Sequence, residues 1–421
     1  MDYVKRLFPV LVLAALVWPG AVLAGGPIGS SFIIGDQAPP VDTVYPSVAF
    51  NSISGDYLVV WQNDRPGFDD IYGQMVSGEG KLIGGWRAIA AGAGAERRSP
   101  DVAHNLNFNE YLVVWEHTNS GTGALSIRGQ RVDDRGDRVE NEFVISAPGP
   151  GTVHRPRVAH AFSAGSYLVV WERYVQGSPG SDIVGQMVSG DGSLWGAPIV
   201  IAQGTWQHTM GRPNLAYNRA RNEFLVAWNQ EVNSTGHTDI RARRVTGAGA
   251  PLQPPSLVVT SYVQSSTSPS VAAIPQPMGK GRYLVAWEIL WSTGNRHVYA
   301  RIINGDGGMT VPVLDVAGSP LDEFAPAVAG NEKSQSFLVT WITDELSLFL
   351  SHALEVTIEG ELAPVALLEP KVFADHPSVS SGPLADFLTV FDGQTLSSNL
   401  DIHGVQWGER VYMPLVLRNW P

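Results

Sequence analysis

Residues 57–61 read Tyr57-Leu-Val-Val-Trp61, and this short stretch decides the fold because the chain repeats it. Close copies end at Trp115, Trp171, Trp228, Trp287 and Trp341. A seventh copy, Phe387-Leu-Thr-Val-Phe391, has phenylalanine in place of the tryptophan. The last residues of successive copies lie 50 to 59 positions apart. Self-similarity at such a period indicates an architecture in which each repeat is one supersecondary unit.

The repeated stretch is apolar on both faces of the strand that it predicts. Side chains alternate along a strand, so Tyr57, Val59 and Trp61 point to one face and Leu58 and Val60 to the other. A strand that is apolar on both faces has to be covered from both sides. We therefore expect each unit to be packed between two neighbouring units.

Three further segments complete each unit. A proline followed in most units by x-Val-Ala lies about eleven residues before each copy, at Pro46, Pro100, Pro156, Pro213, Pro269, Pro326 and Pro377. After several copies comes Asp-Ile-x-Gly-Gln, as at Asp70–Gln74 and Asp182–Gln186, and a fourth apolar segment closes most units. Four short strands per unit in seven units predict an all-β, seven-bladed β-propeller.

The repeats predict the domain boundaries and the way in which the ring closes. We assign the propeller to residues 46–407, with repeats at 46–99, 100–155, 156–212, 213–268, 269–325, 326–376 and 377–407. The last repeat lacks a fourth strand, and residues 25–45 contain a spare one, Phe32-Ile-Ile34. This strand is expected to complete the last blade and to remove an open edge. An open solenoid would not need such a split unit.

The two ends of the chain predict export. Residues 1–24 hold Lys5 and Arg6, an apolar run over Leu7–Val17 and small residues before position 25, which is the build of a secretory signal peptide. A retained membrane anchor is the alternative, but the run is short and is followed by Pro19-Gly20. The mature chain is expected to be secreted or on the cell surface, with no spanning segment. Residues 408–421 form a tail whose Val411–Arg418 stretch is apolar.

Composition and motifs exclude several function classes. The net charge of -12 disfavours nucleic acid as a partner, and the absence of cysteine excludes disulfides and thiolate sites. The chain has no His-Glu-x-x-His, Gly-x-Ser-x-Gly or phosphate-loop motif. Glycine-rich turns such as Ser77–Gly80 and Asn304–Gly307 are better explained as hairpin turns than as calcium loops. No cofactor and no metal are therefore expected.

Polar residues gather on one predicted face of the ring. The loops that enter the first strands and the ends of the second strands lie on the same face of a propeller. There we place a candidate ligand site made of Glu116, Glu172, Arg155, Arg157, Trp206, His208, Arg212 and Tyr174. Convergent polar groups in a concavity are the default site hypothesis. The alternative is that the glutamates and arginines pair between blades and hold the ring together.

The repeat resembles those of secreted bacterial β-propeller proteins, most of which have no known activity. The resemblance rests on the Pro-x-Val-Ala, Tyr-Leu-Val-Val-Trp and Asp-Ile-x-Gly-Gln segments and covers Phe32 to Trp407. It implies the fold and extracytoplasmic location but no reaction. The tail at Val411–Arg418 is similar to a C-terminal tail of some of these proteins, where it implies an export or surface-association signal.

Two functions follow as expectations. The first is a non-catalytic binding or scaffold module at the cell surface that engages a glycan or a protein through its loop face, with no catalytic residue assigned. The alternative is a secreted carbohydrate-active propeller enzyme, in which a carboxylate such as Glu172 or Glu116 serves as acid or base. Fold alone does not separate them, because propellers host both.

Overall fold

The protein is described by a computed structural model that covers residues 26–35, 41–65, 67–178, 180–205, 208–232, 236–254, 256–260, 264–276, 281–345, 348–369, 373–382, 386–394 and 400–408. The signal peptide, Trp206 and the Val411–Arg418 tail lie outside these residues. Within them, no helix has the length and apolar character that a membrane span requires. The described helical structure is one 3-10 turn, Phe162–Ala164.

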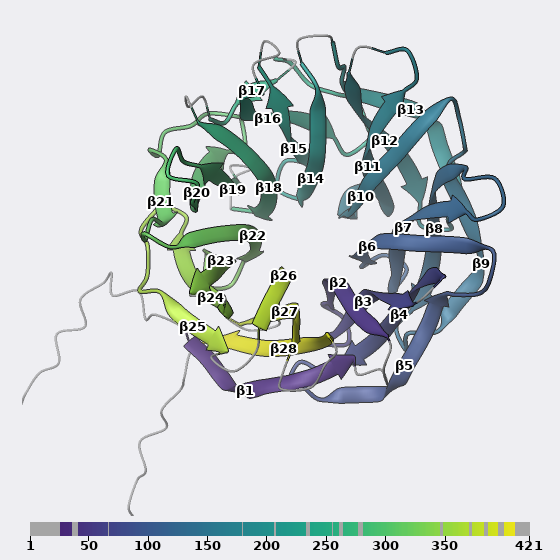
Figure 1. Ribbon diagram of the computed structural model, residues 1–421, viewed down its shortest axis with the longest axis horizontal. Helices are drawn as coiled ribbons and strands as arrows, with labels where there is room; N and C mark the ends of the chain where they lie inside the picture. The colour runs from purple at the N-terminus through teal and green to yellow at the C-terminus, as the bar shows by residue number, and fades with distance from the viewer. Residues whose placement is uncertain are drawn as a thin grey trace, which may run out of the picture.

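Seven four-stranded antiparallel sheets form a ring, which confirms the predicted seven-bladed propeller (Figure 1). Blade one contains β2 (Asp42–Asn51), β3 (Asp56–Arg65), β4 (Phe68–Val76) and β5 (Leu82–Ala90). Blade two contains β6 (Ala95–Asn105), β7 (Glu110–Asn119), β8 (Leu125–Asp133) and β9 (Arg138–Ser146). Blade three contains β10 (Gly151–Ala161), β11 (Ser166–Val175), β12 (Ser181–Ser189) and β13 (Leu194–Ala202).

Blades four to six follow the same order. Blade four contains β14 (Met210–Asn218), β15 (Glu223–Glu231), β16 (Thr238–Thr246) and β17 (Leu257–Val258). Blade five contains β18 (Ser265–Ile274), β19 (Arg282–Leu290), β20 (Arg296–Asn304) and β21 (Leu314–Ala317). Blade six contains β22 (Asp322–Asn331), β23 (Ser336–Glu345), β24 (Leu348–Thr357) and β25 (Ala366–Glu369). The seventh blade combines β26 (Phe373–Ser381), β27 (Phe387–Gln394) and β28 (Asp401–Gly408) with β1 (Gly26–Gly35).

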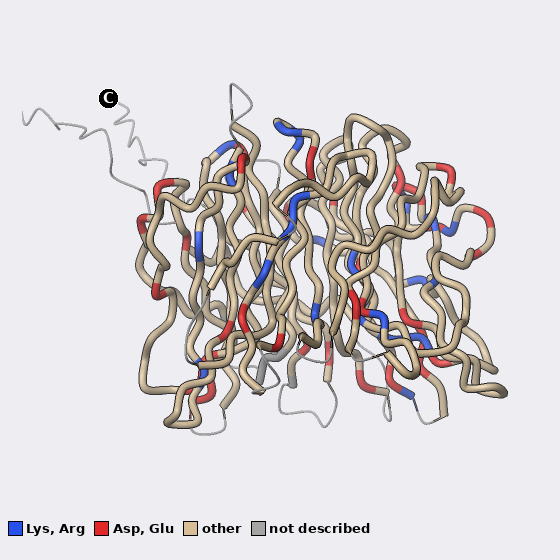
Figure 2. Tube along the Cα trace, turned by 90° about the horizontal axis from the view of Figure 1, so that it is seen from above, with Lys and Arg blue, Asp and Glu red and all other residues tan. Residues whose placement is uncertain are grey.

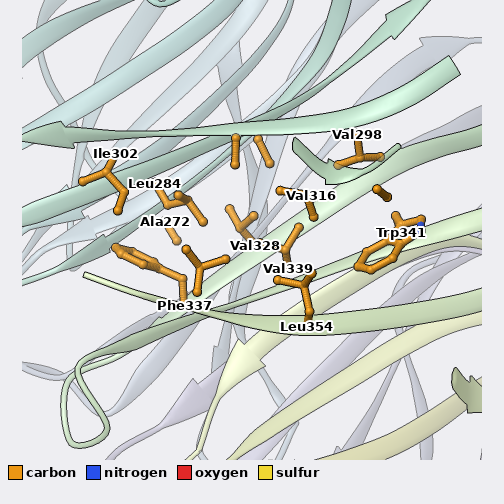
Figure 3. Close-up of a cluster of buried hydrophobic side chains, with 14 of the residues drawn as sticks. Ala272, Leu284, Val298, Ile302, Val316, Val328, Phe337, Val339, Trp341 and Leu354 are labelled. Carbon is orange, nitrogen blue, oxygen red and sulfur yellow. The ribbon is translucent and has the colours of Figure 1, made fainter. Parts of the chain in front are cut away.

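The repeated stretch is the second strand of each blade, and its two faces pack into two different interfaces. Leu58 and Val60 of β3 join a buried cluster with the second strand of blade two. The opposite face, with Trp61, joins a cluster with β27 of the last blade. Figure 3 shows the same arrangement between blades five and six, where Leu284 packs in one cluster with Trp341. One such cluster occupies each of the seven blade interfaces.

The N-terminal strand closes the ring as the sequence predicts. β1 runs antiparallel to β28, with Phe32 opposite Gly404 and Ile33 opposite His403 (Figure 1). The side chain of Ile34 is buried in the interface between the last and first blades, whereas Ile33 faces outward with 42% of its surface exposed. Gly404 lets this strand pack closely, because a Cβ atom there would lie 2.8 Å from the side chains of Ile34 and Phe32, which would have to shift.

The glutamine of the Asp-Ile-x-Gly-Gln motif braces the third strand against the fourth. In the first three blades its Nε2 donates to a carbonyl of the fourth strand, from Gln74 to Ile83 (2.9 Å), Gln130 to Val139 (2.9 Å) and Gln186 to Trp195 (3.0 Å). Blades four and five have arginine instead. Arg243 and Arg301 each donate to a carbonyl of the preceding blade, Ile201 (2.7 Å) and Val259 (2.8 Å) respectively. The motif is therefore structural.

The glycine-rich turns after the third strands have the geometry of hairpin turns. In each, the glycine N–H donates to the carbonyl three residues earlier, as from Gly80 to Ser77 (2.8 Å) and from Gly307 to Asn304 (2.8 Å). The φ angles of these glycines are 77° and 94°, a conformation that favours glycine. Turn geometry thus accounts for these residues.

The first prediction concerns the closing strand. Replacing Ile34 with Ala removes a buried side chain from the interface between the last and first blades, and should lower the free energy of unfolding by about 2–4 kcal/mol. Ile33→Ala, one position away on the exposed face, should change it by less than about 0.5 kcal/mol. Equilibrium denaturation of both variants measures the difference. Equal effects at the two positions would contradict the packing of this strand.

The second prediction concerns two histidines on the first strands of blades two and three. Burial lowers the pKa of His104 and of His160 to about 4. Their rings contact Tyr111 and Tyr167, with centroids 5.0 and 5.6 Å apart. The unfolded chain takes up these protons near pH 6.5 and the folded chain only near pH 4. Stability should therefore fall by about 1–3 kcal/mol per histidine as the pH drops across this window.

The matched variants copy blade one, which has Phe50 at the same place against Tyr57. A double variant with His104→Phe and His160→Phe cannot titrate at these positions. It should lose less melting temperature than the natural chain between pH 7 and pH 4.5. An identical loss in the two proteins would refute the assignment.

Candidate functional site

A cavity of about 650 Å³ lies at the centre of the ring. All seven first strands contribute to its lining, through the residues on either side of the repeat prolines. Each of these prolines lies inside its strand, where a break in the strand register marks a β-bulge, as between Val44 and Ser47 in β2. Proline is tolerated at bulges because it has no N–H to pair.

The residue before each proline has a left-handed backbone conformation and lines the cavity. These seven residues are Tyr45, Ser99, Arg155, Arg212, Ser268, Ala325 and His376, with φ between 42° and 54°. Side chains other than glycine adopt this conformation only where the surroundings enforce it. We call these seven positions the mouth ring. The backbone of the ring is repeated, but its side chains differ from blade to blade.

At three of the bulges, a polar residue near the end of the second strand in the preceding blade accepts a hydrogen bond from the mouth-ring N–H. The N–H of Ser99 donates to Gln62 Oε1 (3.2 Å), and the N–H of Arg155 donates to Glu116 Oε1 (2.7 Å). Glu288 accepts from the N–H of Ala325 in the same way. These polar residues near the ends of second strands therefore join neighbouring blades, but they do so through backbone N–H donors and not through the glutamate–arginine pairs weighed in the sequence.

Glu116 and Glu172 are both held by donors. His154 Nδ1 lies 3.1 Å from Glu116 Oε2, so the two oxygens of Glu116 have separate partners. Arg155 Nη1 donates to Glu172 Oε2 at 2.8 Å, within the same blade. The side chains of Glu116 and Glu172 are 13% and 18% exposed, whereas that of Arg155 is 45% exposed. The cation therefore faces the solvent and the carboxylates lie behind it.

These contacts shift the proton affinities of the pair at blades two and three. Burial acts to raise the pKa of Glu116, but the hydrogen bonds from His154 and from the Arg155 N–H outweigh it, so this pKa lies below its ordinary value. The hydrogen bond to Glu116 raises the pKa of His154. Both shifts favour the charged forms of the two groups, the carboxylate of Glu116 and the imidazolium of His154.

A second set of polar residues, directly after the repeat prolines, links the first strands. The N–H of Val158 donates to Asp101 Oδ2 (2.8 Å), and Ser47 Oγ donates to Asp101 Oδ1 (2.8 Å). The N–H of Val271 donates to Asn214 Oδ1 (3.1 Å), and that of Val328 to Ser270 Oγ (3.2 Å). We call these acceptors the inner girdle. Burial raises the pKa of Asp101 in spite of the neighbouring Arg157.

Arg157 and Arg212 also line the cavity. Arg157 Nη1 donates to the carbonyl of Pro156 (2.9 Å), and Arg212 Nη1 donates to Ser268 Oγ (3.3 Å). Burial lowers the pKa of Arg212, and the cations of Arg155 and Arg157 add to this effect. Three guanidinium groups therefore influence one another at the junction of blades three and four. Elsewhere basic and acidic residues are interspersed around the ring (Figure 2).

The structure brings together five of the eight residues proposed from the sequence. Glu116, Arg155, Arg157 and Arg212 line the cavity, and Glu172, which is outside the lining, is paired with Arg155. Tyr174 and His208 are outside the cavity lining. Tyr174 is 46% exposed near the outer end of β11, and the Nδ1 atom of His208 lies 3.0 Å from the carbonyl oxygen of Glu231. Trp206 is outside the described residues. The structure therefore does not place His208 and Tyr174 beside the other proposed residues, and their part in ligand binding stays a prediction.

Sequence reasoning missed the mouth ring and the inner girdle. Asp101, Asn214 and Tyr45 were not proposed, although they line the cavity. A signal was present, since each lies next to a repeat proline. The prolines were used only to define the repeat. Among the described residues, no group of three or more His, Asp or Glu side chains is arranged to hold a metal ion.

Comparisons with known proteins support the fold. No protein-family model matches the chain, and no curated protein matches it in sequence. A protein of unknown function from Dyadobacter fermentans is similar in structure, with a TM-score of 0.54, 11% identity and coverage of 90% of this chain and 98% of that chain. The NanB sialidase from Streptococcus pneumoniae has a TM-score of 0.50 and 9% identity, with coverage of 91% and 70%. At these identities the likeness concerns the fold alone.

The third prediction separates the two glutamates. Glu116→Gln should lower the free energy of unfolding by about 1–3 kcal/mol, because the neutral amide weakens two charge-assisted hydrogen bonds across a blade interface. Glu172→Gln should change it by about 1 kcal/mol or less, because its partner Arg155 is largely solvated. Thermal and chemical unfolding of both variants test this order. A larger loss at Glu172 would contradict the geometry.

Proposed function

We propose that this chain is a non-catalytic, exported binding module that engages a glycan or a protein ligand at the mouth of its central cavity. The observation that carries the proposal is the mouth ring. Its backbone is the same in seven blades, yet its side chains are Tyr45, Ser99, Arg155, Arg212, Ser268, Ala325 and His376. A ring that only held the blades together would not need seven such different side chains around a cavity.

The state of the carboxylates supports binding over hydrolysis. A glycosidase needs two carboxyl groups facing an open space, one to give a proton and one to act as base or nucleophile. Both oxygens of Asp101 and both of Glu116 are held by partners in neighbouring strands. Glu172 is paired with Arg155. These groups hold blades and cations in place, which fits a scaffold that presents a binding surface.

Export is part of the proposal and rests on the N-terminal sequence. The charged start, the apolar run and the small residues up to Ala24 support secretion. The chain has no cysteine, so its fold outside the cytoplasm would have to be stable without disulfides. The buried clusters at the seven blade interfaces supply that stability. Detection of the mature chain outside the cytoplasm, beginning near residue 25, would support this part independently.

The fourth prediction tests the mouth with a neutral obstruction. Ser99→Tyr places in blade two the residue that blade one has at the same mouth-ring position, Tyr45, so the backbone should accept it. Binding on a glycan array and to surface proteins should weaken about tenfold or more, while the melting temperature stays close to that of the natural chain. No release of chromophore from aryl glycosides is expected.

The control is Ser52→Tyr, the same substitution on the exposed hairpin between β2 and β3. It should leave binding unchanged. Equal binding by both variants would place the ligand away from the cavity, and turnover of a glycoside that Glu172→Gln abolishes would replace the binding module by an enzyme.

A further inference from the structure

We propose that the junction of blades three and four binds a carboxylate, presented by a uronic acid residue of an acidic glycan. This inference rests on the proposed function and names its ligand class. The first observation is that blade three has Arg157 where the inner girdle has a hydrogen-bond acceptor, and the cations nearby are the second observation. In most blades the residue after the repeat proline accepts a hydrogen bond from the next blade or carries a hydroxyl group.

The rule of the girdle is visible in three blades. Asp101, Asn214 and Ser270 each accept the N–H of the second residue after the proline in the following blade, which is Val158, Val271 and Val328 respectively. These N–H groups point away from their own second strand because each residue sits at the same place in the strand register, as Val158 does opposite Val169. At these three junctions an acceptor from the preceding blade therefore satisfies the N–H group.

Blade three breaks the rule. Its residue after the proline is Arg157, which has donors and no acceptor. On blade four, Leu215 lies opposite Val226 in the same register as Val158 opposite Val169, so its N–H is directed toward the same gap. Among the described residues, no side chain accepts from this N–H. The junction thus offers a backbone donor and a guanidinium where the junctions after blades two, four and five offer an acceptor.

Two further cations add donors to this junction. Arg155 and Arg212 are the mouth-ring residues of these two blades, and both line the cavity with Arg157. The two mouth-ring arginines have exposed side chains, whereas Glu116 and Glu172 lie behind them with their own partners. A ligand that enters the cavity therefore meets guanidinium groups first. Arginine forks match the two oxygens of a carboxylate, and such charge-assisted bonds are strong.

The junction of blades six and seven provides a contrast within the same ring. Ala327 follows its proline there and also offers no acceptor. The described residues at that junction include no arginine among the cavity lining. A missing acceptor alone therefore does not define the site. The combination of the gap with three arginines is found at blades three and four.

The surroundings favour a sugar as the carrier of the carboxylate. Seven strands enclose the cavity, so a compact ring or the end of a glycan chain fits more readily than a folded protein surface. Tyr45 lines the same cavity, is 42% exposed and lies 4.1 Å from His376 between ring centroids. Such an aromatic face is suited to the apolar side of a sugar ring.

The test uses two ligands that differ only in charge, α-1,4-linked trigalacturonate and its fully methyl-esterified form. Calorimetric titration of the mature chain should detect the acid, with the ester weaker by on the order of tenfold to a hundredfold. Binding of the acid should also weaken as salt is raised. Equal affinity for acid and ester would overturn the proposal, as would tighter binding of hexaglutamate, which would make the ligand an acidic peptide.

Arg157→Asn is the decisive variant, because it rebuilds the girdle. Asparagine can accept the N–H of Leu215 as Asn214 accepts that of Val271, so the melting temperature should be kept or raised while trigalacturonate binding falls at least about tenfold. Arg138→Asn makes the same charge change on the exposed strand β9 and should bind as the natural chain does. Arg212→Gln serves as a second site variant if Arg157→Asn does not fold.

The outcomes separate this inference from the proposed function. Retained binding by both site variants would overturn the carboxylate site. Binding of an uncharged glycan that Ser99→Tyr abolishes, without binding of trigalacturonate, would overturn the ligand class and leave the mouth as the binding site. Absence of any ligand that responds to Ser99→Tyr would remove both.

Discussion

The interlocking of the second strands is the interaction on which the rest of the structure depends. One face of each strand packs in the cluster that holds the opposite face of the next, from Leu58 beside Trp115 round to Leu388 beside Trp61. Because each strand is shared between two interfaces, no blade has a core of its own. The hydrophobic stabilisation is obtained only in a closed ring, which explains why a strand from the N-terminus completes the last blade.

This division of labour leaves the centre free of apolar packing. The first strands meet around the axis through small residues and polar acceptors, and the bulges at the repeat prolines turn seven side chains toward the cavity. Stability thus comes from the second strands, and the first strands tolerate polar and charged residues such as Arg157 and Arg212. The junction of blades three and four gives up one interblade hydrogen bond without endangering the ring, since the buried cluster at this junction and those at the two neighbouring junctions are intact.

The fold could be predicted from sequence because burial leaves a periodic trace. Burial on both faces constrains Tyr57-Leu-Val-Val-Trp61 and its copies, so the apolar pattern persists in all blades. The last repeat lacks a fourth strand, and this absence predicted that Phe32–Ile34 completes the last blade. The site was only partly predictable. The contact of Glu116 across the blades could be expected from its place near a strand end, whereas the repeat pattern does not record that Tyr174 and His208 lie outside the cavity lining. The left-handed bulge beside each proline likewise leaves no hydrophobic pattern, and its residues vary freely.

The uniform backbone of the mouth ring has a consequence for how this protein can change. Seven positions share one conformation and differ only in side chain, so a residue that works in one blade is sterically acceptable in another, as Tyr45 and His376 show beside Ser99 and Ala325. Duplication or exchange of blades would rearrange these seven side chains around the cavity without a change in the backbone of the ring. New ligand specificities can therefore arise by single substitutions at these seven positions, while the packed strands outside the ring keep their fold.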